Sequence, residues 1–234
     1  MAFEPIAIVG RGCVVPGACD PDTFWANIMA GKSSLAPEAG GGIVRDSDPA
    51  FDPAGFAVDA GEIMRLDPIY RWVLHAARQA LREAGRAGEP LPGAGLVLGN
   101  LSYPSAGLVA FAEETWRRGA GPAGTVLADT GPADTGPAGR DGRDRFSSGL
   151  PVHFAASALG LGAGGFALDA ACASALYAIK LGCDRLHDRT ADLMVAGGVS
   201  CTDRPLVDSR RATETGRQRS QAAHAGRPAP RRTA

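Results

Sequence analysis

The sequence predicts an α/β fold, and two features of it carry this prediction. Short apolar runs bounded by glycine, typical of buried strands, alternate along the chain with segments whose apolar residues recur at helical spacing. With 234 residues and 45% hydrophobic side chains, the chain is long enough to bury one large core or two small ones. We therefore expect strands and helices that pack in layers.

The first predicted strand is the apolar run at residues 6–9, which ends in a turn at Gly10 and Gly12. The Gly-x-Gly pair is part of a dinucleotide-binding fingerprint. No third glycine follows at the required spacing, and Pro16 interrupts the segment. A buried strand and a turn are therefore expected here, without a nucleotide site.

Two helices follow, and each has a recognisable start. Asp20 and Asp67 stand at N-cap positions, directly before Pro21 and Pro68, and Gly31 and Gly85 are the natural ends. Between the helices, residues 36–62 are rich in glycine, proline and aspartate and predict a loop. The apolar positions that define the two helices are Phe24, Trp25, Ile28 and Met29 in the first, and Ile69, Trp72, Val73, Ala76, Ala77, Ala80, Leu81 and Ala84 in the second.

The second half of the chain repeats the alternation. Strands are predicted at residues 96–98, 166–168 and 193–198, and helices over 108–116 and 173–187. Residues 119–143, rich in glycine and proline with a tandem Ala-Asp-Thr-Gly-Pro repeat, predict a flexible insertion. The helix from 173 is apolar on nearly all sides until Lys180, so we expect it to be buried, and Gly182 within it predicts close backbone packing.

Composition excludes several classes of protein. No apolar run approaches the length of about 18 residues that a transmembrane helix needs, and the N-terminus lacks the pattern of a signal peptide. The five cysteines contain no Cys-x-x-Cys pair, so a zinc ribbon is not expected, and their sparse use predicts reduced thiols in the cytoplasm.

Charge is unevenly distributed. Residues 1–203 carry 16 basic and 23 acidic side chains, a balance of −7 that gives no sign of nucleic-acid binding. Residues 204–234 hold eight arginines and almost no apolar residues, so they predict a disordered basic tail. A tail that binds nucleic acid stays open as the alternative.

Cys172 is the candidate nucleophile. It stands between a predicted strand and a predicted helix, with small residues on both sides, as a nucleophile on a sharp strand-to-helix turn requires. N–H groups of the first helical turn would stabilise a thiolate and an oxyanion. The alternative is that Cys172 is a small buried hydrophobe. The other four cysteines are expected in the core: Cys13, Cys19, Cys183 and Cys201.

The segment Asp169-Ala-Ala-Cys172-Ala-Ser-Ala-Leu176 resembles the nucleophile motif of β-ketoacyl synthases, with the closest likeness to iterative polyketide and polyunsaturated-fatty-acid synthases. Further similarities follow in the family's order: Glu4-Pro-Ile-Ala-Ile-Val-Gly10 with Cys13 and Pro16-Gly17, Phe24-Trp25 with Gly31, Asp67-Pro68 with Arg71, Ala80-Leu81-Arg-Glu-Ala-Gly85, and Ala196-Gly-Gly-Val199.

This resemblance implies a thiolase-like fold, in which two similar layered α/β halves with mixed sheets stack face to face, commonly as a dimer. Residues 1–203 match the N-terminal half, and the family pattern stops near Asp203. We therefore expect an incomplete, truncated ketosynthase with the basic tail of residues 204–234 behind it.

The resemblance also implies the reaction, an acyl transfer in polyketide or fatty-acid synthesis. An acyl group would pass from an acyl carrier protein to Cys172, and malonyl carrier protein would then decarboxylate and attack the acyl thioester. The substrates are attached to the phosphopantetheine of the carrier protein, so the chain itself is expected to hold no cofactor and no metal. A homodimer or a larger synthase assembly is expected, without nucleic acid or membrane.

The family's two catalytic histidines, one of them in a His-Gly-Thr motif, have no counterpart in this sequence. His75, His153 and His187 stand at other positions, and His224 lies in the basic tail. We therefore expect a chain that is inactive in the full condensation. The alternative is a non-catalytic ketosynthase-like protein that binds carrier protein or pairs with another chain.

Overall fold

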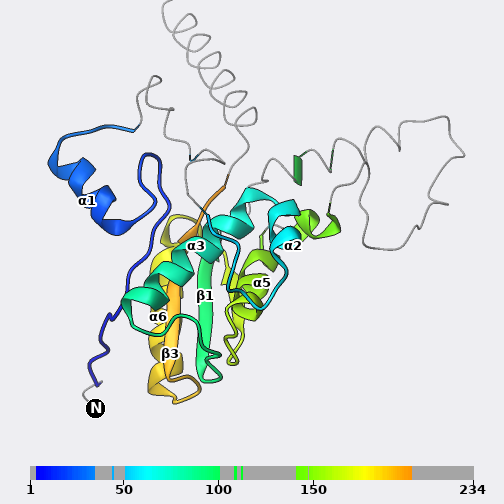
Figure 1. Ribbon diagram of the computed structural model, residues 1–234. Helices are drawn as coiled ribbons and strands as arrows, with labels where there is room; N and C mark the ends of the chain where they lie inside the picture. Colours follow the sequence, from blue (N-terminus) through cyan, green and yellow to red (C-terminus); the bar gives the residue numbers. More distant parts are fainter. Residues whose placement is uncertain are drawn as a thin grey trace, which may run out of the picture.

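A computed structural model describes residues 4–34, 44, 51–100, 108–109, 112, 141–146 and 148–201. Three helices come first, and strands then alternate with helices along the chain (Figure 1). In order they are α1 Pro21–Met29, α2 Ala60–Arg65, α3 Pro68–Glu83, β1 Ala94–Asn100, the 3₁₀ turn η3 Gly142–Phe146, α5 Leu150–Ala158, β2 Gly165–Leu168, the 3₁₀ turn η4 Ala171–Ala173, α6 Ser174–His187 and β3 Leu193–Val199.

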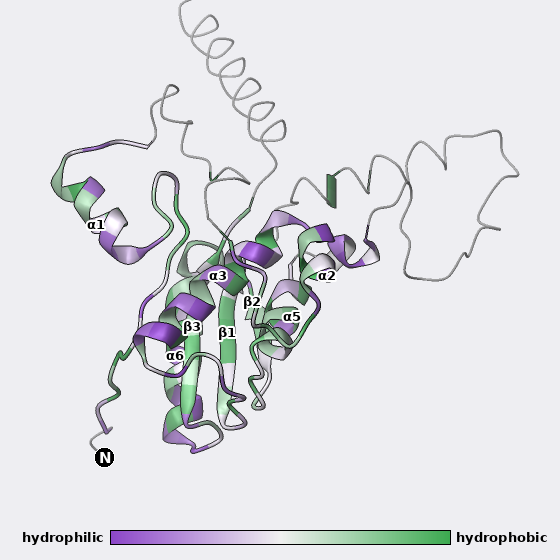
Figure 2. Ribbon diagram, viewed as in Figure 1, coloured by the Kyte–Doolittle hydropathy of each residue, from purple (hydrophilic) through white to green (hydrophobic). Residues whose placement is uncertain are grey.

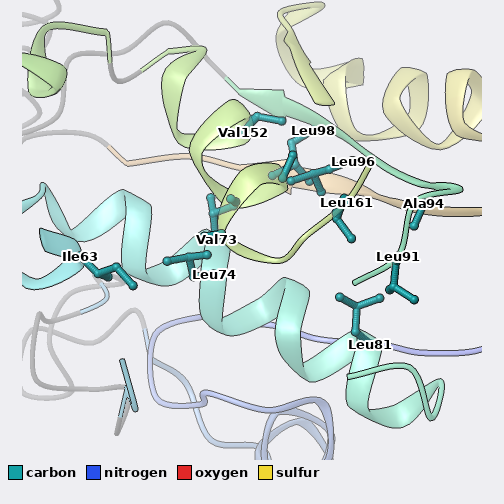
Figure 3. Packing of buried hydrophobic residues seen from close by; sticks show 13 residues of the cluster. Ile63, Val73, Leu74, Leu81, Leu91, Ala94, Leu96, Leu98, Val152 and Leu161 are labelled. Atoms are coloured by element: carbon teal, nitrogen blue, oxygen red, sulfur yellow. The ribbon is translucent and has the colours of Figure 1, made fainter. Parts of the chain in front are cut away.

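The three strands form one parallel sheet in the order β2-β1-β3, with Val97 of β1 opposite Phe166 of β2 and Ala196 of β3. All seven residues of β1 are buried, as expected for the central strand of a parallel sheet. Helix α6 covers one face of the sheet, and α3 and α5 cover the other (Figures 1 and 3). The predicted α/β layering is confirmed. The resemblance implied a mixed sheet, whereas the strands among the described residues are all parallel.

The main hydrophobic core lies between the sheet, α3 and α5. Leu74 of α3, Leu96 of β1 and Val152 of α5 are fully buried there, and Ile63 of α2 closes one end (Figure 3). Figure 2 shows the same division, with β1 and β3 hydrophobic and hydrophilic residues on the outer side of α3. Complete burial of a leucine side chain stabilises the fold by about 2 kcal/mol.

Helix α3 begins and ends as predicted. The Asp67 carboxylate accepts a hydrogen bond from the Ile69 N–H at 3.0 Å, and Gly85 takes a positive φ of 67° just after the helix. Its buried surface is wider than the predicted stripe, because Tyr70 and Leu74 also face the core. The helix has two packed sides, one on α5 and the sheet and the other on the N-terminal segment.

The prediction of a buried strand at residues 6–9 is wrong. They are extended, but they pair with no strand among the described residues, and the Ile8 side chain is 89% exposed. The segment is held by α3 rather than by the sheet. A Cβ atom at Gly10 would lie 2.0 Å from the Ala80 carbonyl oxygen, and one at Gly12 would lie equally close to that of Ala76.

Three further expectations need changes. The prediction of a buried helix from 173 is wrong for its outer face, because Leu176 is 71% and Tyr177 55% exposed while only the inner side meets the sheet. Helix α2 begins within the loop predicted over residues 36–62 and extends three residues beyond it, and the Asp59 carboxylate caps it by accepting the Glu62 N–H. Helix α5 carries no cap signal from a side chain, and sequence reasoning missed it.

Other predictions concern residues that lie outside the described part of the chain. Of the helix expected over 108–116, the described residues Leu108, Val109 and Ala112 are helical. Most of the insertion 119–143 and all of the tail 204–234 lie outside. Within the described ranges, no helix combines the length and the apolar character needed to span a bilayer.

Candidate functional site

Cys172 lies in the short 3₁₀ turn η4, between the end of β2 and the start of α6. The three strands are parallel, so this turn stands at the edge of the sheet where all their carboxyl ends meet. Ligands of open α/β sheets bind at that edge. The Cys172 side chain is exposed and free, so a substrate can reach its sulfur.

The backbone before Cys172 is strained. Ala171 has a φ of +51°, in the left-handed region where a residue other than glycine costs about 1–2 kcal/mol. The Asp169 carboxylate stabilises this conformation by accepting the Ala171 N–H at 2.9 Å. Strain of this kind is retained where a turn must hold a side chain in a fixed position.

Ser174 holds the other side of the turn. Its hydroxyl oxygen accepts the Ala170 N–H at 2.8 Å and donates to the Ala171 carbonyl oxygen at 2.7 Å. The side chain is buried, with 5% of the residue exposed. Asp169 and Ser174 therefore position the turn. Both belong to the motif named in the sequence analysis, which gave them no role. The signal in the sequence was the spacing. Asp169 stands two residues before the N–H that it accepts, and Ser174 stands four residues after the N–H that it accepts.

Helix α6 lies unusually close to the sheet beneath the turn. A Cβ atom at Gly99 of β1 would come within 2.5 Å of the Ser174 Cβ, and one at Gly182 would lie 3.4 Å from the Ala196 side chain. The distance at Gly182 is that of an ordinary van der Waals contact, so the close backbone packing predicted there is found at Gly99 instead. The contact at Gly99 also gives the physical reason for small residues around Cys172.

The turn already uses part of the helix N-terminus. The Ala173 N–H donates to the Ala170 carbonyl oxygen at 3.2 Å, and the Ser174 N–H donates to that of Ala171. No side chain caps α6. The sequence analysis assigned the first-turn N–H groups to a thiolate or oxyanion, and the structure shows two of those near Cys172 bonded within the turn itself.

The other cysteines are less accessible than Cys172. Cys13, Cys19, Cys183 and Cys201 are half-buried. Burial raises the pKa of the Cys13 thiol, and the nearby Asp20 carboxylate adds to this increase. Cys13 is therefore less nucleophilic than an ordinary thiol at neutral pH.

The histidines lie in structural contacts or on the surface. The Nε2 atom of His75 is 2.8 Å from the Cys19 carbonyl oxygen, and that of His187 is 3.0 Å from the Glu4 carbonyl oxygen. His153 is exposed on α5, and His224 lies outside the described residues. No cluster of three metal-ligating side chains occurs in the described part of the chain.

Sequence comparison gives a family match over almost the whole chain. The family described as beta-ketoacyl synthase, N-terminal domain, matches residues 3–225, which extends beyond the limit near Asp203 drawn from the sequence. A phenolphthiocerol/phthiocerol polyketide synthase of Mycobacterium tuberculosis (strain CDC 1551 / Oshkosh) is 30% identical over 229 residues. A mycocerosic acid synthase-like polyketide synthase of Mycolicibacterium smegmatis is 29% identical over 233 residues.

The chain is short beside these relatives. The two matches cover 86% and 89% of this chain but only 13% and 10% of the respective relatives. Among solved structures, the PfaC keto synthase-chain length factor is similar with a TM-score of 0.67 and 31% identity, over 84% of this chain and 24% of that one. The ishigamide ketosynthase/chain length factor shares the fold, with a TM-score of 0.60 and 17% identity over 85% and 48% of the two chains.

Proposed function

Since this chain belongs to the β-ketoacyl synthase family and carries its N-terminal domain, we propose that Cys172 is the nucleophile that accepts an acyl group in a ketosynthase reaction. The observation that supports this most directly is the exposed cysteine on a strained turn at the carboxyl edge of the sheet. The turn presents the sulfur to solvent while Asp169 and Ser174 fix its backbone.

The loading step needs little beyond that geometry. The Cys172 thiolate attacks the carbonyl carbon of an acyl thioester on the phosphopantetheine of an acyl carrier protein, and a new sulfur–carbon bond forms. The bond between the carbonyl carbon and the pantetheine sulfur breaks. The leaving pantetheine thiolate then takes up a proton, which balances the one that Cys172 lost.

Condensation needs more. Malonyl carrier protein would lose carbon dioxide, and the resulting carbanion would attack the acyl group on Cys172 and release the thiolate. Groups that stabilise the developing negative charge on the malonyl thioester oxygen are required, and losing one such donor costs about 100- to 1000-fold in rate. The family's His-Gly-Thr motif does not occur in residues 1–234. We therefore assign loading, and not condensation, to these 234 residues on their own.

The test is acylation of the purified chain with hexanoyl N-acetylcysteamine, followed by peptide mapping by mass spectrometry. Acyl transfer should occur at Cys172 and disappear in Cys172→Ala, while the half-buried Cys13 and Cys183 serve as internal controls. Preferential acylation of any other cysteine would overturn the assignment. Carbon dioxide release from malonyl carrier protein above the level of Cys172→Ala would overturn the restriction to loading.

The missing histidines favour a second candidate, a ketosynthase-like protein without catalytic function that binds carrier protein or pairs with another chain. An absence of acylation at Cys172 in a folded protein would support it.

Under either proposal the partners are an acyl carrier protein and a second ketosynthase chain, and the exposed Leu176 and Tyr177 of α6 offer an apolar surface for such pairing. A cytoplasmic location stays a prediction of the sequence.

A further inference from the structure

The chain makes a tight hairpin directly before α1 (Figure 1), and a cysteine stands on each arm of it. Val15 and Ala18 exchange both of their backbone hydrogen bonds, at 2.8 Å and 3.0 Å. Gly17 between them has a φ of 81°, which lets the chain reverse over two residues. Cys13 precedes the bonded pair by two residues, and Cys19 follows it by one. The hairpin therefore brings the two cysteines to neighbouring positions on opposite arms.

The spacing of the arms suits a disulfide. Opposed residues that exchange both hydrogen bonds have Cα atoms about 5.5 Å apart, and an offset of one residue adds about 3.4 Å along the strand. For arms that stay side by side, the Cα atoms of Cys13 and Cys19 are then about 6.5 Å apart, within the range of about 4.4–6.8 Å that a disulfide spans. A regular ladder would point the two side chains to opposite faces. The chain bends at Cys19 and Asp20, however, so the ladder ends at Ala18 and does not fix that orientation.

One side chain of α3 holds both arms. The Cys13 N–H donates to Gln79 Oε1 at 3.0 Å, and Gln79 Nε2 donates to the Cys19 carbonyl oxygen at 3.4 Å. One turn earlier on α3, His75 Nε2 lies 2.8 Å from the same carbonyl oxygen. Because a single amide group contacts both residues, the arms stay side by side at the two cysteines.

The two thiols also interact electrostatically. The pKa of the Cys13 thiol is raised by burial first, and then by the Asp20 carboxylate and by Cys19. Charge interactions weaken with distance, so the contribution of Cys19 indicates that its sulfur lies close to that of Cys13. Both cysteines are half-buried, and neither is part of a disulfide in this structure.

We propose that Cys13 and Cys19 are a redox-active pair, which a small-molecule disulfide such as oxidised glutathione converts reversibly to an intramolecular disulfide. The Cys19 thiolate attacks one sulfur of oxidised glutathione, a mixed disulfide forms, and one glutathione thiolate leaves. The Cys13 thiolate then attacks the Cys19 sulfur, and the second glutathione thiolate leaves. Two cysteine thiols are oxidised and one glutathione disulfide is reduced. The two glutathione thiolates take up the two protons that the cysteines lose.

The disulfide would act on the N-terminal part of the fold. Asp20, next to Cys19, caps α1 by accepting the Thr23 N–H at 2.7 Å. Cys13 directly follows Gly12, which packs on the α3 backbone at Ala76. A bond between the two cysteines would join α1 to the segment that lies on α3, so oxidation should restrict the position of α1. The proposal does not use Cys172, whose acylation tests the proposed function separately.

The test is equilibration of the purified chain in glutathione buffers of rising oxidised fraction. The reaction is quenched with acid, the remaining thiols are labelled with maleimide, and tryptic peptides are mapped by mass spectrometry. No lysine or arginine lies between Cys13 and Cys19, so both fall in one peptide, residues 12–32. This peptide should lose two hydrogen atoms and take up no maleimide. A disulfide from Cys13 to Cys183 or Cys201 would overturn the proposal, and so would a peptide that stays reduced where Cys172 already carries glutathione.

Two further measurements distinguish the folded hairpin from closeness in the sequence alone. In concentrated urea the equilibrium constant for the disulfide should fall by about tenfold or more, because the arms are no longer held together. In the folded chain Gln79→Ala should lower it by about tenfold, the effect of losing hydrogen bonds that hold the arms. Arg82→Ala, at an exposed site on α3, is the control and should leave it unchanged. Equal constants in buffer and in urea, or equal effects of the two substitutions, would overturn the proposal.

Discussion

Two residues other than glycine have a positive φ in the described part of the chain, Ala171 and Arg189. Arg189 follows the end of α6, where helices commonly terminate in this conformation. Ala171 has no such reason, because it precedes a helix. The turn beside Cys172 is therefore held by specific contacts: the Asp169 carboxylate accepts the N–H of the strained Ala171, and the Ser174 hydroxyl donates to its carbonyl oxygen.

Replacing Asp169 tests that contact. We expect Asp169→Ala to slow acylation of Cys172 by about 10- to 100-fold, because a misplaced nucleophile loses its alignment with the thioester. Asp169→Asn keeps an oxygen acceptor for the Ala171 N–H and should restore most of the rate. Circular dichroism spectra of both variants should match the wild type. Equal loss in both variants would show that the charge of Asp169, and not the turn, is responsible.

The Asp141 carboxylate should make the free energy of unfolding depend on pH. Hydrogen bonds from Arg143, at 2.8 Å and 2.6 Å, lower the pKa of the Asp141 carboxyl below its ordinary value of 3.8. Because the folded-state pKa is the lower one, the stabilisation is complete above 3.8 and is lost as the pH falls through the folded-state value. Asp141→Asn should reduce the free energy of unfolding by about 1 kcal/mol at neutral pH.

The difference between wild type and Asp141→Asn should shrink in urea titrations as the pH falls below 3.8. Asp22→Asn is the control, since the Asp22 side chain is 92% exposed and lies 3.8 Å from Arg11. It should unfold like the wild type at each pH. A difference for Asp141→Asn that stays constant down to low pH would contradict a charge-based contribution.

At the scale of elements, the contact between α6 and the sheet decides where Cys172 stands. Gly99 on β1 allows the first turn of α6 to approach the sheet, and Gly198 on β3 does the same beside Ala175. Each is a position where a methyl group would meet the helix. The strand-to-helix turn is therefore placed by glycines on two other strands as well as by its own sequence.

Gly99→Ala should destabilise the protein by about 1–3 kcal/mol, the cost of overpacking, because its Cβ would meet Ser174. Gly149→Ala is a matched control, since Gly149 has a negative φ and nothing within 4 Å of its added Cβ. Gly149 is the N-cap of α5, where alanine is less favourable than glycine, so this substitution should reduce the free energy of unfolding by less than about 1 kcal/mol. Thermal and urea unfolding measure both, and equal effects would show that the close approach at Gly99 is unimportant.

For the whole molecule, most of the large exposed apolar side chains of the described residues lie on two helices and on the N-terminal segment, where Ile8 is 89% exposed. On α6 they are Leu176, Tyr177 and Ile179, and on α1 they include Trp25 and Met29. Several exposed apolar side chains on one helix are typical of a contact with another protein. The outer face of α6 begins directly after Cys172, so a partner there would also shield the candidate site.

We expect the chain to self-associate in gel filtration, with an apparent mass that rises with concentration. The double substitution Leu176→Gln and Tyr177→Gln should lower the apparent mass toward that of the monomer, because it removes apolar area from the contact. Replacing Met64 of α2, which is 50% exposed, with Gln is the control. A monomer at all concentrations in the wild type would refute the prediction.

The sequence by itself determined the elements whose signals are local. Asp67 and Pro68 mark the start of α3, Gly85 marks its end, and the apolar run at residues 96–98 marks the central strand. Small residues around Cys172 indicated a close strand-to-helix turn, which the contact at Gly99 confirms. Such signals act over a few residues and need no partner from elsewhere in the chain.

The tertiary structure decided what an element meets. Residues 6–9 have the composition of a buried strand, yet they lie on α3 because Gly10 and Gly12 admit its backbone there. Helix α6 is apolar on most sides, but only its inner face is covered. Asp169 and Ser174 acquire their roles only when the turn brings them to Ala170 and Ala171. Periodicity reports how much apolar surface an element has, and only the assembled neighbours decide how much of it is buried.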